Sequence, residues 1–516
     1  MGSCRSLLVP LCLCALAVAI VGCSPVTHSD KQTVSRLSFV GDDGHDQPDS
    51  HTPFEWSTRN IFVAVGVCLC ALLANSAGVG GGPLYIPLFN TVLGFDIPHC
   101  TALSHTVVSV SAIGSSLYGM LQPSPTHPDR PLLNFDLALT FIPPLLFGVS
   151  VGVAFNSFVP EWLQVLLLVF LLSFVIKNIV TKGVTQFRHE QSALEKQAHA
   201  KATGRLWRES ALNPSDPKGI THDESFHPVE PEGEFVHPDQ EPLLDEGERQ
   251  EAAETGLAPS SSTVQQADTW RSNASIVWKR LPLLQLGEVI LLWVIFLAFQ
   301  LAKVSYVKCS LEWTLVYIGQ AIFCLGTSAA FVYYQYFKML DNPDNVDPEL
   351  RAILTAGGHH DGHPQGTAGM VRTLLNCAGL MALAGATAGL LGIGGALIFN
   401  PYLLSLGVSP QVVASTAVLM ILFSSSSIAL SLNFIGLLNQ HFAVIFAPLA
   451  FAFSLLGVLI VGRIIRKTGR TSIIILILAF LIIIGAISTL VFGGLRAEKK
   501  LIAGEFGFKP FCSTGR

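Results

Sequence analysis

Long runs of apolar residues, separated by short polar segments, make up most of this chain. A helix needs about 20 mainly apolar residues to cross the hydrocarbon core of a bilayer, and most of these runs reach that length. They predict membrane helices at 60–80, 100–121, 135–157, 160–180, 284–302, 312–337, 373–391, 410–432, 441–462 and 471–493. Two shorter apolar pieces, 83–95 and 396–406, follow the first and the seventh of these helices. The pattern predicts an all-α, polytopic membrane protein.

Two glycine-rich stretches interrupt this pattern inside apolar runs. They contain Gly80, Gly81 and Gly82 in the first and Gly392, Gly394 and Gly395 in the second. In a helix interior, glycine costs about 1 kcal/mol relative to alanine and proline about 3 kcal/mol, and Pro83 and Pro87 follow the first stretch closely. We therefore expect broken helices at both places. At membrane depth, a break is tolerated only where protein covers it or where it lines a watery cavity.

The second stretch repeats the surroundings of the first. Placing Gly81–Gly82 on Gly394–Gly395 brings Gly94 onto Gly407 without a gap. Ordered matches of this kind indicate two homologous helical repeats, and broken helices in corresponding positions of two repeats are typical of transporters.

The chain divides into eight segments. We expect a signal peptide at 1–23, a disordered lumenal or extracellular tail at 24–58, transmembrane repeat 1 at 59–180, a polar disordered cytosolic insert at 181–283, two connecting transmembrane helices at 284–337, a polar loop at 338–371, transmembrane repeat 2 at 372–494 and a C-terminal tail at 495–516. The first segment has Arg5 before an apolar run and small residues after it, which is the layout of a signal peptide. The insert is too acidic and polar to bury a core.

The orientation of the repeats depends on whether the two short pieces cross the membrane. With four crossings per repeat, the long insert lies on the outside, whereas five crossings put it in the cytosol and make the repeats inverted. Lys and Arg near span ends favour the cytosol, and they flank the insert and fill the loop that contains Arg463, Arg466, Lys467 and Arg470. We therefore prefer the five-crossing, inverted arrangement.

Composition excludes a soluble protein. Of the 516 residues 50% are hydrophobic and only 13% are charged, and the acidic residues behind the net charge of −5 gather in the insert. No nucleic-acid partner and no cofactor is implied. The cysteines lack zinc spacing, the cluster of His359, His360 and His363 is better explained as a solvated loop than as a metal site, and Cys309 and Cys512 are positioned for a disulfide.

The chemistry expected at the breaks is anion binding. A break exposes backbone N–H groups at helix N-termini, which carry partial positive charge. As substrate-binding residues we expect Gly80, Gly81, Gly82, Ser104, His105, Gly392, Gly394, Gly395, Ser415 and Thr416. The alternative is that small residues serve close helix packing and that His105 is a histidine hydrogen-bonded inside the bundle. An ionisable group within a span is otherwise a candidate functional residue, and histidine could carry a proton.

The motifs resemble the TauE/SafE family of sulfite exporter-like permeases, in particular its plant-type and protist branch. The residues that carry the resemblance are Gly80–Gly82, Pro87, Gly94–Asp96, Thr101–Ser104, Tyr118, Asp136–Leu139, Gly152–Asn156, Cys309–Trp313, Gly392–Gly395, Pro401, Gly407–Val412 and Ser424–Ser427. One position departs from the plant-type pattern, because His105 stands where that pattern has lysine. The resemblance implies secondary transport of small sulfur-containing anions such as sulfite, sulfonates or related organosulfur acids, with proton coupling as an option.

We expect a non-enzymatic carrier that moves a small anion across a membrane of the secretory pathway. One rival is a receptor or sorting protein whose insert recruits cytosolic partners, since Asp239–Leu244 has the form of an acidic dileucine signal for a sorting adaptor. An intramembrane enzyme is the other rival, but the spans lack paired acids, metal sets and Ser–His pairs. A homo-oligomer is compatible with the sequence.

Overall fold

A computed structural model describes residues 53–95, 97–124, 130–156, 158–192 with gaps, 283–341, 347–356, 367–468 except 393, 472–494 with gaps, and 507. The chain forms two compact units, 189–275 and the remainder, and the helices named below belong to the larger unit. The predicted signal peptide, most of the tail and the insert, Cys512 and the sorting signal at Asp239–Leu244 lie outside the described residues.

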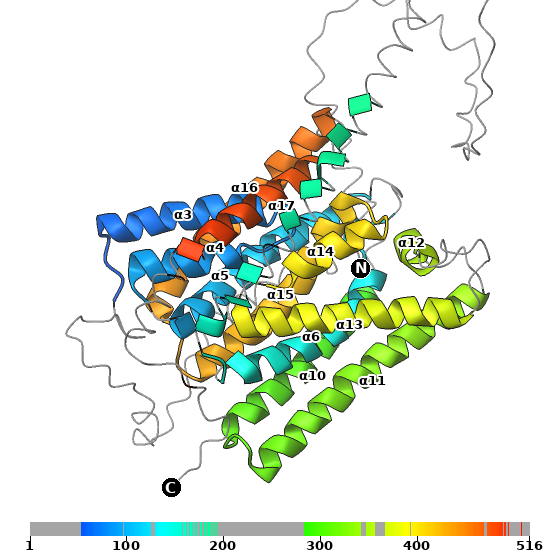
Figure 1. Cartoon of the computed structure of the whole chain (residues 1–516), viewed down its shortest axis with the longest axis horizontal. Coiled ribbons are helices and arrows are strands. Elements are labelled where there is room, and N and C mark those ends of the chain that lie inside the picture. Colours follow the sequence, from blue (N-terminus) through cyan, green and yellow to red (C-terminus); the bar gives the residue numbers. More distant parts are fainter. Residues whose placement is uncertain are drawn as a thin grey trace, which may run out of the picture. The chain divides into compact units, whose positions relative to one another are not determined.

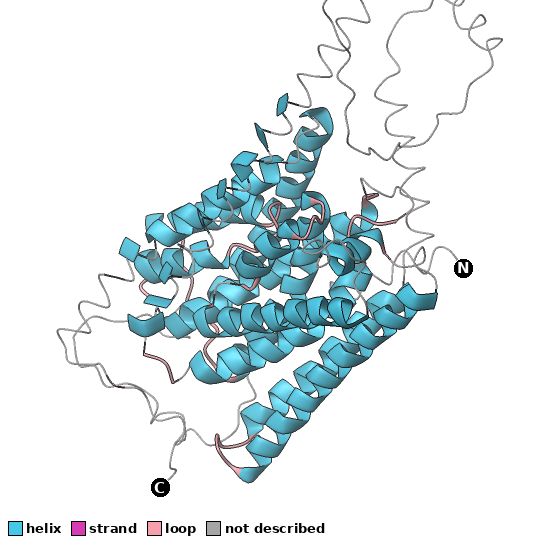
Figure 2. Ribbon diagram, turned by 45° about the vertical axis from the view of Figure 1, so that its right-hand side comes forward, coloured by secondary structure: helices cyan, strands magenta, loops and turns pink. Residues whose placement is uncertain are grey.

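The described elements are helices, joined by loops and one isolated β-bridge between Pro123 and Pro131 (Figures 1 and 2). They are α3 (Thr58–Ala74), α4 (Gly82–Leu88), the π-helix η1 (Phe89–Leu93), α5 (Ile97–Leu121), α6 (Phe135–Asn156), α10 (Leu283–Ser305), α11 (Leu311–Asp341), α12 (Pro348–Ala356), α13 (Thr367–Leu391), α14 (Ala396–Ser405), α15 (Pro410–Phe434), α16 (Gln440–Thr468) and α17 (Ser472–Ser488). Among them, seven are long and apolar enough to cross a membrane. The all-α, polytopic prediction is confirmed.

The first short piece turns back along the helix before it. The Arg59 guanidinium donates a hydrogen bond to the Leu93 carbonyl oxygen at 3.2 Å, and a Cβ on Gly66 would meet the Leu88 side chain. The start of α3 therefore lies beside the end of η1, with the glycine stretch at the far end of the hairpin.

The second short piece forms the same kind of hairpin. The Cys377 thiol in α13 donates to the Tyr402 hydroxyl in α14 at 3.7 Å, and a Cβ on Gly395 would contact the Ala384 carbonyl. Each piece therefore runs back along the helix before it. This path is compatible with the five-crossing arrangement, and the crossing of the membrane by the short pieces stays a prediction.

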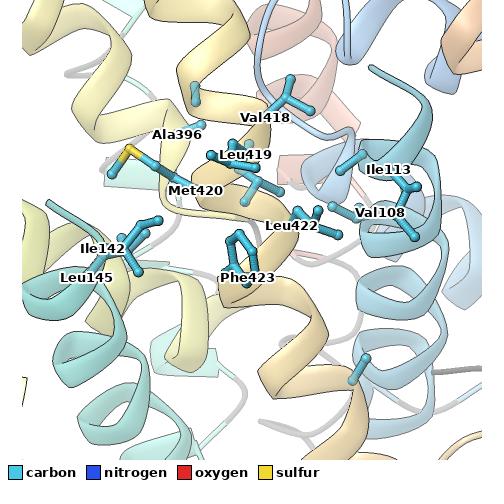
Figure 3. Packing of buried hydrophobic residues seen from close by; sticks show 14 of the residues in the cluster. Val108, Ile113, Ile142, Leu145, Ala396, Val418, Leu419, Met420, Leu422 and Phe423 are labelled. Atoms are coloured by element: carbon cyan, nitrogen blue, oxygen red, sulfur yellow. The ribbon is translucent and has the colours of Figure 1, made fainter. Parts of the chain in front are cut away.

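Helices α5 and α15 form the centre of the described bundle and run antiparallel. The ring Nδ1 of His99, at the start of α5, lies 2.7 Å from the Leu437 carbonyl oxygen just after α15, whereas Gly119, near the end of α5, faces Ser415 near the start of α15. Figure 3 shows the apolar side chains of α15 between those of α5 and α6. Helices α5 and α15 are almost completely buried.

Helices α6 and α13 pack along a seam of glycines. A Cβ on Gly148 or Gly152 of α6 would lie within about 2 Å of a carbonyl of α13, and Gly385 and Gly389 of α13 face carbonyls of α6 in return. Small residues let membrane helices approach this closely. In the same way, Gly457 of α16 meets the Leu72 carbonyl of α3.

These contacts join each half of the chain to the other. Helix α13 lies on α6 and α3 lies on α16, so corresponding helices of the two predicted repeats occupy corresponding places. An inverted duplication would produce this arrangement, and the duplication itself stays a prediction.

Two predicted segments contain more ordered structure than expected. The segment 338–371 was expected to be a polar loop, but it contains α12, whose Leu350 and Ile353 are fully buried. The Asp347 carboxylate caps this helix by accepting from the Glu349 backbone N–H. The expected disordered tail at 24–58 also ends too late, because Phe54 packs edge to face on Phe442 and Phe446. In both cases a few apolar residues in a polar segment find buried partners distant in sequence.

Cys309, in the turn between α10 and α11, is disulfide-bonded. The described cysteines Cys68, Cys70, Cys100, Cys324 and Cys377 are free thiols, so the partner of Cys309 lies outside the described residues. Pairing with Cys512 stays a prediction.

Replacing Gly385 by valine should disrupt the α6–α13 seam, because the new Cβ would lie 2.0 Å from the Leu145 carbonyl oxygen. Overpacking costs about 1–3 kcal/mol or more, so we expect a clear loss of thermal stability in detergent. Gly379→Val on the same helix is the matched control, since nothing lies within 4 Å of its Cβ position. Equal melting temperatures for the two variants would contradict the seam.

The return of the first short piece can be tested by cysteine labelling in sealed vesicles. Cysteines introduced at the exposed positions Trp56 and Pro98 should react with an impermeant maleimide from the same side, because α3 and η1 form a hairpin. A cysteine at Lys467 should react from the opposite side, since the end of α16 lies beside Tyr118 and Gln122 at the far end of α5. Labelling of Trp56 and Pro98 positions from opposite sides would mean that the piece does not return.

Candidate functional site

Both glycine stretches are true helix breaks. Helix α3 ends at Ala74 and α4 begins at Gly82, while α13 ends at Leu391 and α14 begins at Ala396. Between them, the backbone takes the left-handed conformation that glycine adopts without penalty, with φ of 74° and 80° at Gly78 and Gly80 and of 73° and 74° at Gly392 and Gly394. Both breaks therefore use left-handed glycines, although Gly81 before α4 is left-handed and Gly395 before α14 is right-handed.

The breaks touch each other. A Cβ on Gly394 would lie 3.6 Å from the Val79 carbonyl oxygen. The buried Asn400, in the first turns of α14, donates its Nδ2 to the Gly78 carbonyl oxygen at 2.9 Å. The structure thus brings together the two stretches that the sequence places more than 300 residues apart.

Each break is also closed by a long helix of the opposite half. A Cβ on Gly78 would lie 2.6 Å from Cα of Ala414 in α15, and one on Gly392 would lie 3.2 Å from the Thr101 side chain in α5. Both contacts lie in the first turns of their helices. The breaks are therefore covered by protein, as membrane depth requires.

Six backbone amides of the breaks form no hydrogen bond with any described residue. They belong to Gly80, Gly81, Gly82, Gly394, Gly395 and Ala396, and all six residues are buried. More than about 90% of buried backbone N–H groups in proteins are paired, so a group of six is unusual. At the N-termini of α4 and α14 such amides suit an anion.

The hydroxyl groups near the breaks are mostly satisfied by their own helices. Thr106, Ser109 and Ser111 bond to carbonyls of α5, and Ser424, Ser426 and Ser427 bond to carbonyls of α15. Within these two strips, the hydroxyls of Ser104 and Ser425 have no partner among the described residues. Most of the strip therefore fits the packing interpretation, and Ser104 keeps a free donor.

His105 is fully buried and neither ring nitrogen has a hydrogen-bond partner among the described residues. It follows Ser104 on α5, one turn beyond Thr101, which contacts the second break. The alternative of a histidine hydrogen-bonded inside the bundle is therefore not what the structure shows.

Ser415 and Thr416 follow Ala414 directly on α15. The Ser415 side chain lies against Gly119 of α5, and the Thr416 hydroxyl accepts a hydrogen bond from the Asn134 backbone N–H at 3.1 Å. The buried Ser415 hydroxyl has no hydrogen-bond partner among the described residues, whereas that of Thr416 is engaged by Asn134, and the role of both in binding stays a prediction.

Two asparagines belong to the site and were missed from the sequence. Asn75 is the C-cap of α3 and donates to the Ser111 hydroxyl at 3.0 Å, and Asn400 holds Gly78 as described above. The Oδ1 atoms of both are buried without a partner among the described residues. Both could have been identified from the sequence, because each is an isolated asparagine in an apolar run close to the glycines.

The site carries no fixed charge. Among the described residues, the buried carboxylates are Asp347 and Glu349, each 8% exposed, which lie at α12 and bond to Asn134 and Ser409. No group of three or more possible metal ligands occurs in the described part of the chain. The arrangement is a neutral cage with unpaired N–H donors, a few hydroxyl and imidazole groups, and two amide oxygens.

Comparison with known proteins gives one family. A model described as "Sulfite exporter TauE/SafE" matches residues 5–178 and 255–500. Among curated relatives, Sulfite exporter TauE/SafE family protein 1 of Arabidopsis thaliana is 27% identical over 90% of this chain and 90% of its own length. Family protein 3 of the same plant is 29% identical, over 90% and 84%. No solved structure matches the chain.

Replacing Gly78 by alanine should destabilise the protein more than replacing Gly407 does. Both residues have positive φ, so each variant carries about 1–2 kcal/mol of backbone strain. The alanine at position 78 additionally meets Ala414 at 2.6 Å, whereas nothing lies within 4 Å at Gly407. Thermal unfolding in detergent measures the difference, and equal losses would show that the first break is not closed by α15.

Proposed function

Since this chain belongs to the sulfite exporter TauE/SafE family, we propose that it is a secondary carrier of small sulfur-containing oxyanions, such as sulfite or a sulfonate. Family members are transporters and not enzymes, and the seven apolar helices described here fit a multi-pass membrane protein. Family membership implies a small anion and a lipid bilayer as partners. Which anion is carried, which ion is coupled to it and in which membrane the protein lies are parts of the proposal.

The observation that carries this proposal is the set of six unpaired, buried amides in two breaks that touch. An oxyanion offers several acceptor oxygens at once, and one ion between the breaks could accept from both half-helices. A sulfite or sulfonate group has three oxygens on one sulfur, so it can meet donors from more than one direction. A buried backbone N–H group without an acceptor lowers stability, and a bound oxyanion would remove this penalty.

The neutral character of the cage suits transport. A lysine or arginine in a buried site would hold an anion strongly, whereas dipoles and neutral donors bind it less tightly and allow release. The same cage excludes cations, because the partial charges of α4 and α14 N-termini are positive. The two free Oδ1 atoms of Asn75 and Asn400 can accept from a protonated ligand oxygen or from water.

We assign proton coupling, if the carrier has it, to His105. It is the buried imidazole beside the cage, and its nitrogens are not engaged by described residues. The lysine of the plant-type pattern would place a permanent charge there. A histidine in its place makes the charge dependent on pH, so this carrier and its lysine-bearing relatives should differ in pH response.

Alternating access would open the pair of breaks to each side in turn. The antiparallel packing of α5 and α15 gives the two ends of the bundle a similar construction, which such a cycle requires. A receptor or sorting role is the second candidate function, and it predicts binding of cytosolic partners without flux.

Uptake of labelled sulfite and methanesulfonate into proteoliposomes tests the proposal. Asn400→Asp keeps the side-chain volume but adds a negative charge beside Gly78, and like charges in a buried site cost several kcal/mol. We expect initial uptake to fall about tenfold or more.

Gln122→Glu is the matched control, because it makes the same amide-to-carboxylate change at the end of α5, beside Arg466. Its uptake should equal that of the unmodified chain. Absence of flux for every sulfur oxyanion in folded protein would exclude the carrier, and equal uptake by Asn400→Asp would place the anion elsewhere.

A further inference from the structure

A second polar cluster lies between α6 and the connecting helices α10 and α11. The Lys303 ammonium donates to the Ser150 hydroxyl at 2.6 Å, and Ser150 donates to the Gln320 side-chain oxygen at 2.9 Å. The Lys303 nitrogen also lies 4.9 Å from the centre of the Tyr317 ring. Lysine, serine and glutamine thus form one connected chain across three helices.

The Lys303 side chain points toward α6, although the residues after it are exposed. It stands in the last turn of α10, from which a lysine in a membrane helix usually extends toward the interface. The residues after it, Val304 and Tyr306, are exposed, so an outward path is open. The ammonium lies instead against Ser150, which is 3% exposed and about two turns before the end of α6.

The positive charge of Lys303 is not balanced within the described residues. No described carboxylate lies within 4.0 Å of its ammonium. Glu312, at the start of α11, is exposed and makes no ion pair with it. A partly buried ammonium without a counter-ion costs free energy, so binding of an anion beside Lys303 would be favourable.

Two amide groups beside Lys303 lack acceptors as well. The Nε2 atoms of Gln320 and Gln300 have no hydrogen-bond partner among the described residues, and these side chains are 1% and 4% exposed. Gln300 lies one turn before Lys303 on the buried face of α10. The cluster therefore offers an ammonium and two amide donors, and what it lacks is an acceptor that carries negative charge.

We propose that Ser150, Lys303 and Gln320 form an oxyanion-binding site distinct from the glycine breaks, with Lys303 as its charge. The ligand is a singly or doubly charged oxygen acid, either a free ion such as sulfate or sulfite or the phosphate of an anionic lipid. Since α10 and α11 are largely exposed along their outer faces, both kinds of ligand can reach the end of these helices.

The site is separate from the transport path proposed above. Gly148 and Gly152 of α6 face α13, which carries the second break. Ser150 lies between them in sequence, and at 100° per residue it faces the opposite side of α6. This second site does not rest on the proposed function, since its donors belong to the connecting helices.

Thermal stabilisation of the purified, delipidated full-length protein tests the site. One arm titrates sodium sulfate, and the other adds phosphatidylglycerol, with phosphatidylcholine as the neutral lipid. The variants are Lys303→Met, which removes the charge, and Lys303→Arg, which keeps it. Lys308→Met is the matched control, because it removes a lysine from the exposed turn at the same end of α10.

We expect Lys303→Met to weaken ligand-dependent stabilisation about tenfold or more, since a charge-assisted bond is lost, while Lys303→Arg and Lys308→Met retain it. If Lys303→Met does not fold, Gln320→Leu supplies the second test, with an expected severalfold weakening.

The two arms identify the source of the anion. A Lys303-dependent effect of sulfate alone assigns a free ion, and one of phosphatidylglycerol alone assigns a lipid phosphate. Stabilisation by both supports a shared oxyanion site. If no response to either ligand depends on Lys303, the proposal is overturned, and the ammonium serves only to join α10 to α6.

Discussion

One constraint governs this structure: a buried backbone N–H group needs a hydrogen-bond acceptor. Two helices end in the interior of the bundle, and their successors begin there, so both breaks leave N–H groups that a continuous helix would have paired. Asn400 donates to the Gly78 carbonyl, but six backbone amides of the breaks have no acceptor among the described residues. The anion site proposed above rests on the way the helices end and needs no charged side chain.

Close contact between the two halves makes these breaks tolerable. The helix ends would be unstable facing lipid, and the chain covers them with the first turns of α5 and α15. Position 78 requires glycine for two separate reasons. The φ of Gly78 is positive, and Ala414 leaves no room for a Cβ there. The residues that open the backbone are thus the same ones that let the opposite half close over it.

Much of this organisation was predictable from the sequence, since it depends on local pattern. The long apolar runs gave α5, α6, α10, α11, α13, α15 and α16 within a few residues, and the glycine runs gave both breaks. Features that depend on distant partners were not predictable. Helix α12 has only nine residues and two fully buried side chains, and the bonds of Asn75 and Asn400 require knowledge of which helices meet. Ser415 and Thr416 were predicted from their place in the sequence, and their role in binding stays a prediction.

The glycine seam between α6 and α13 limits how such a molecule can move. Backbones in contact along two turns cannot slide past one another without collision, so the two helices must travel as a rigid pair. One member comes from each half of the chain, as is also true of α3 and α16. A working cycle cannot therefore consist of one half rocking as a whole against the other. Each moving unit must contain helices from both halves of the chain. The units must slide against one another at interfaces made of larger side chains.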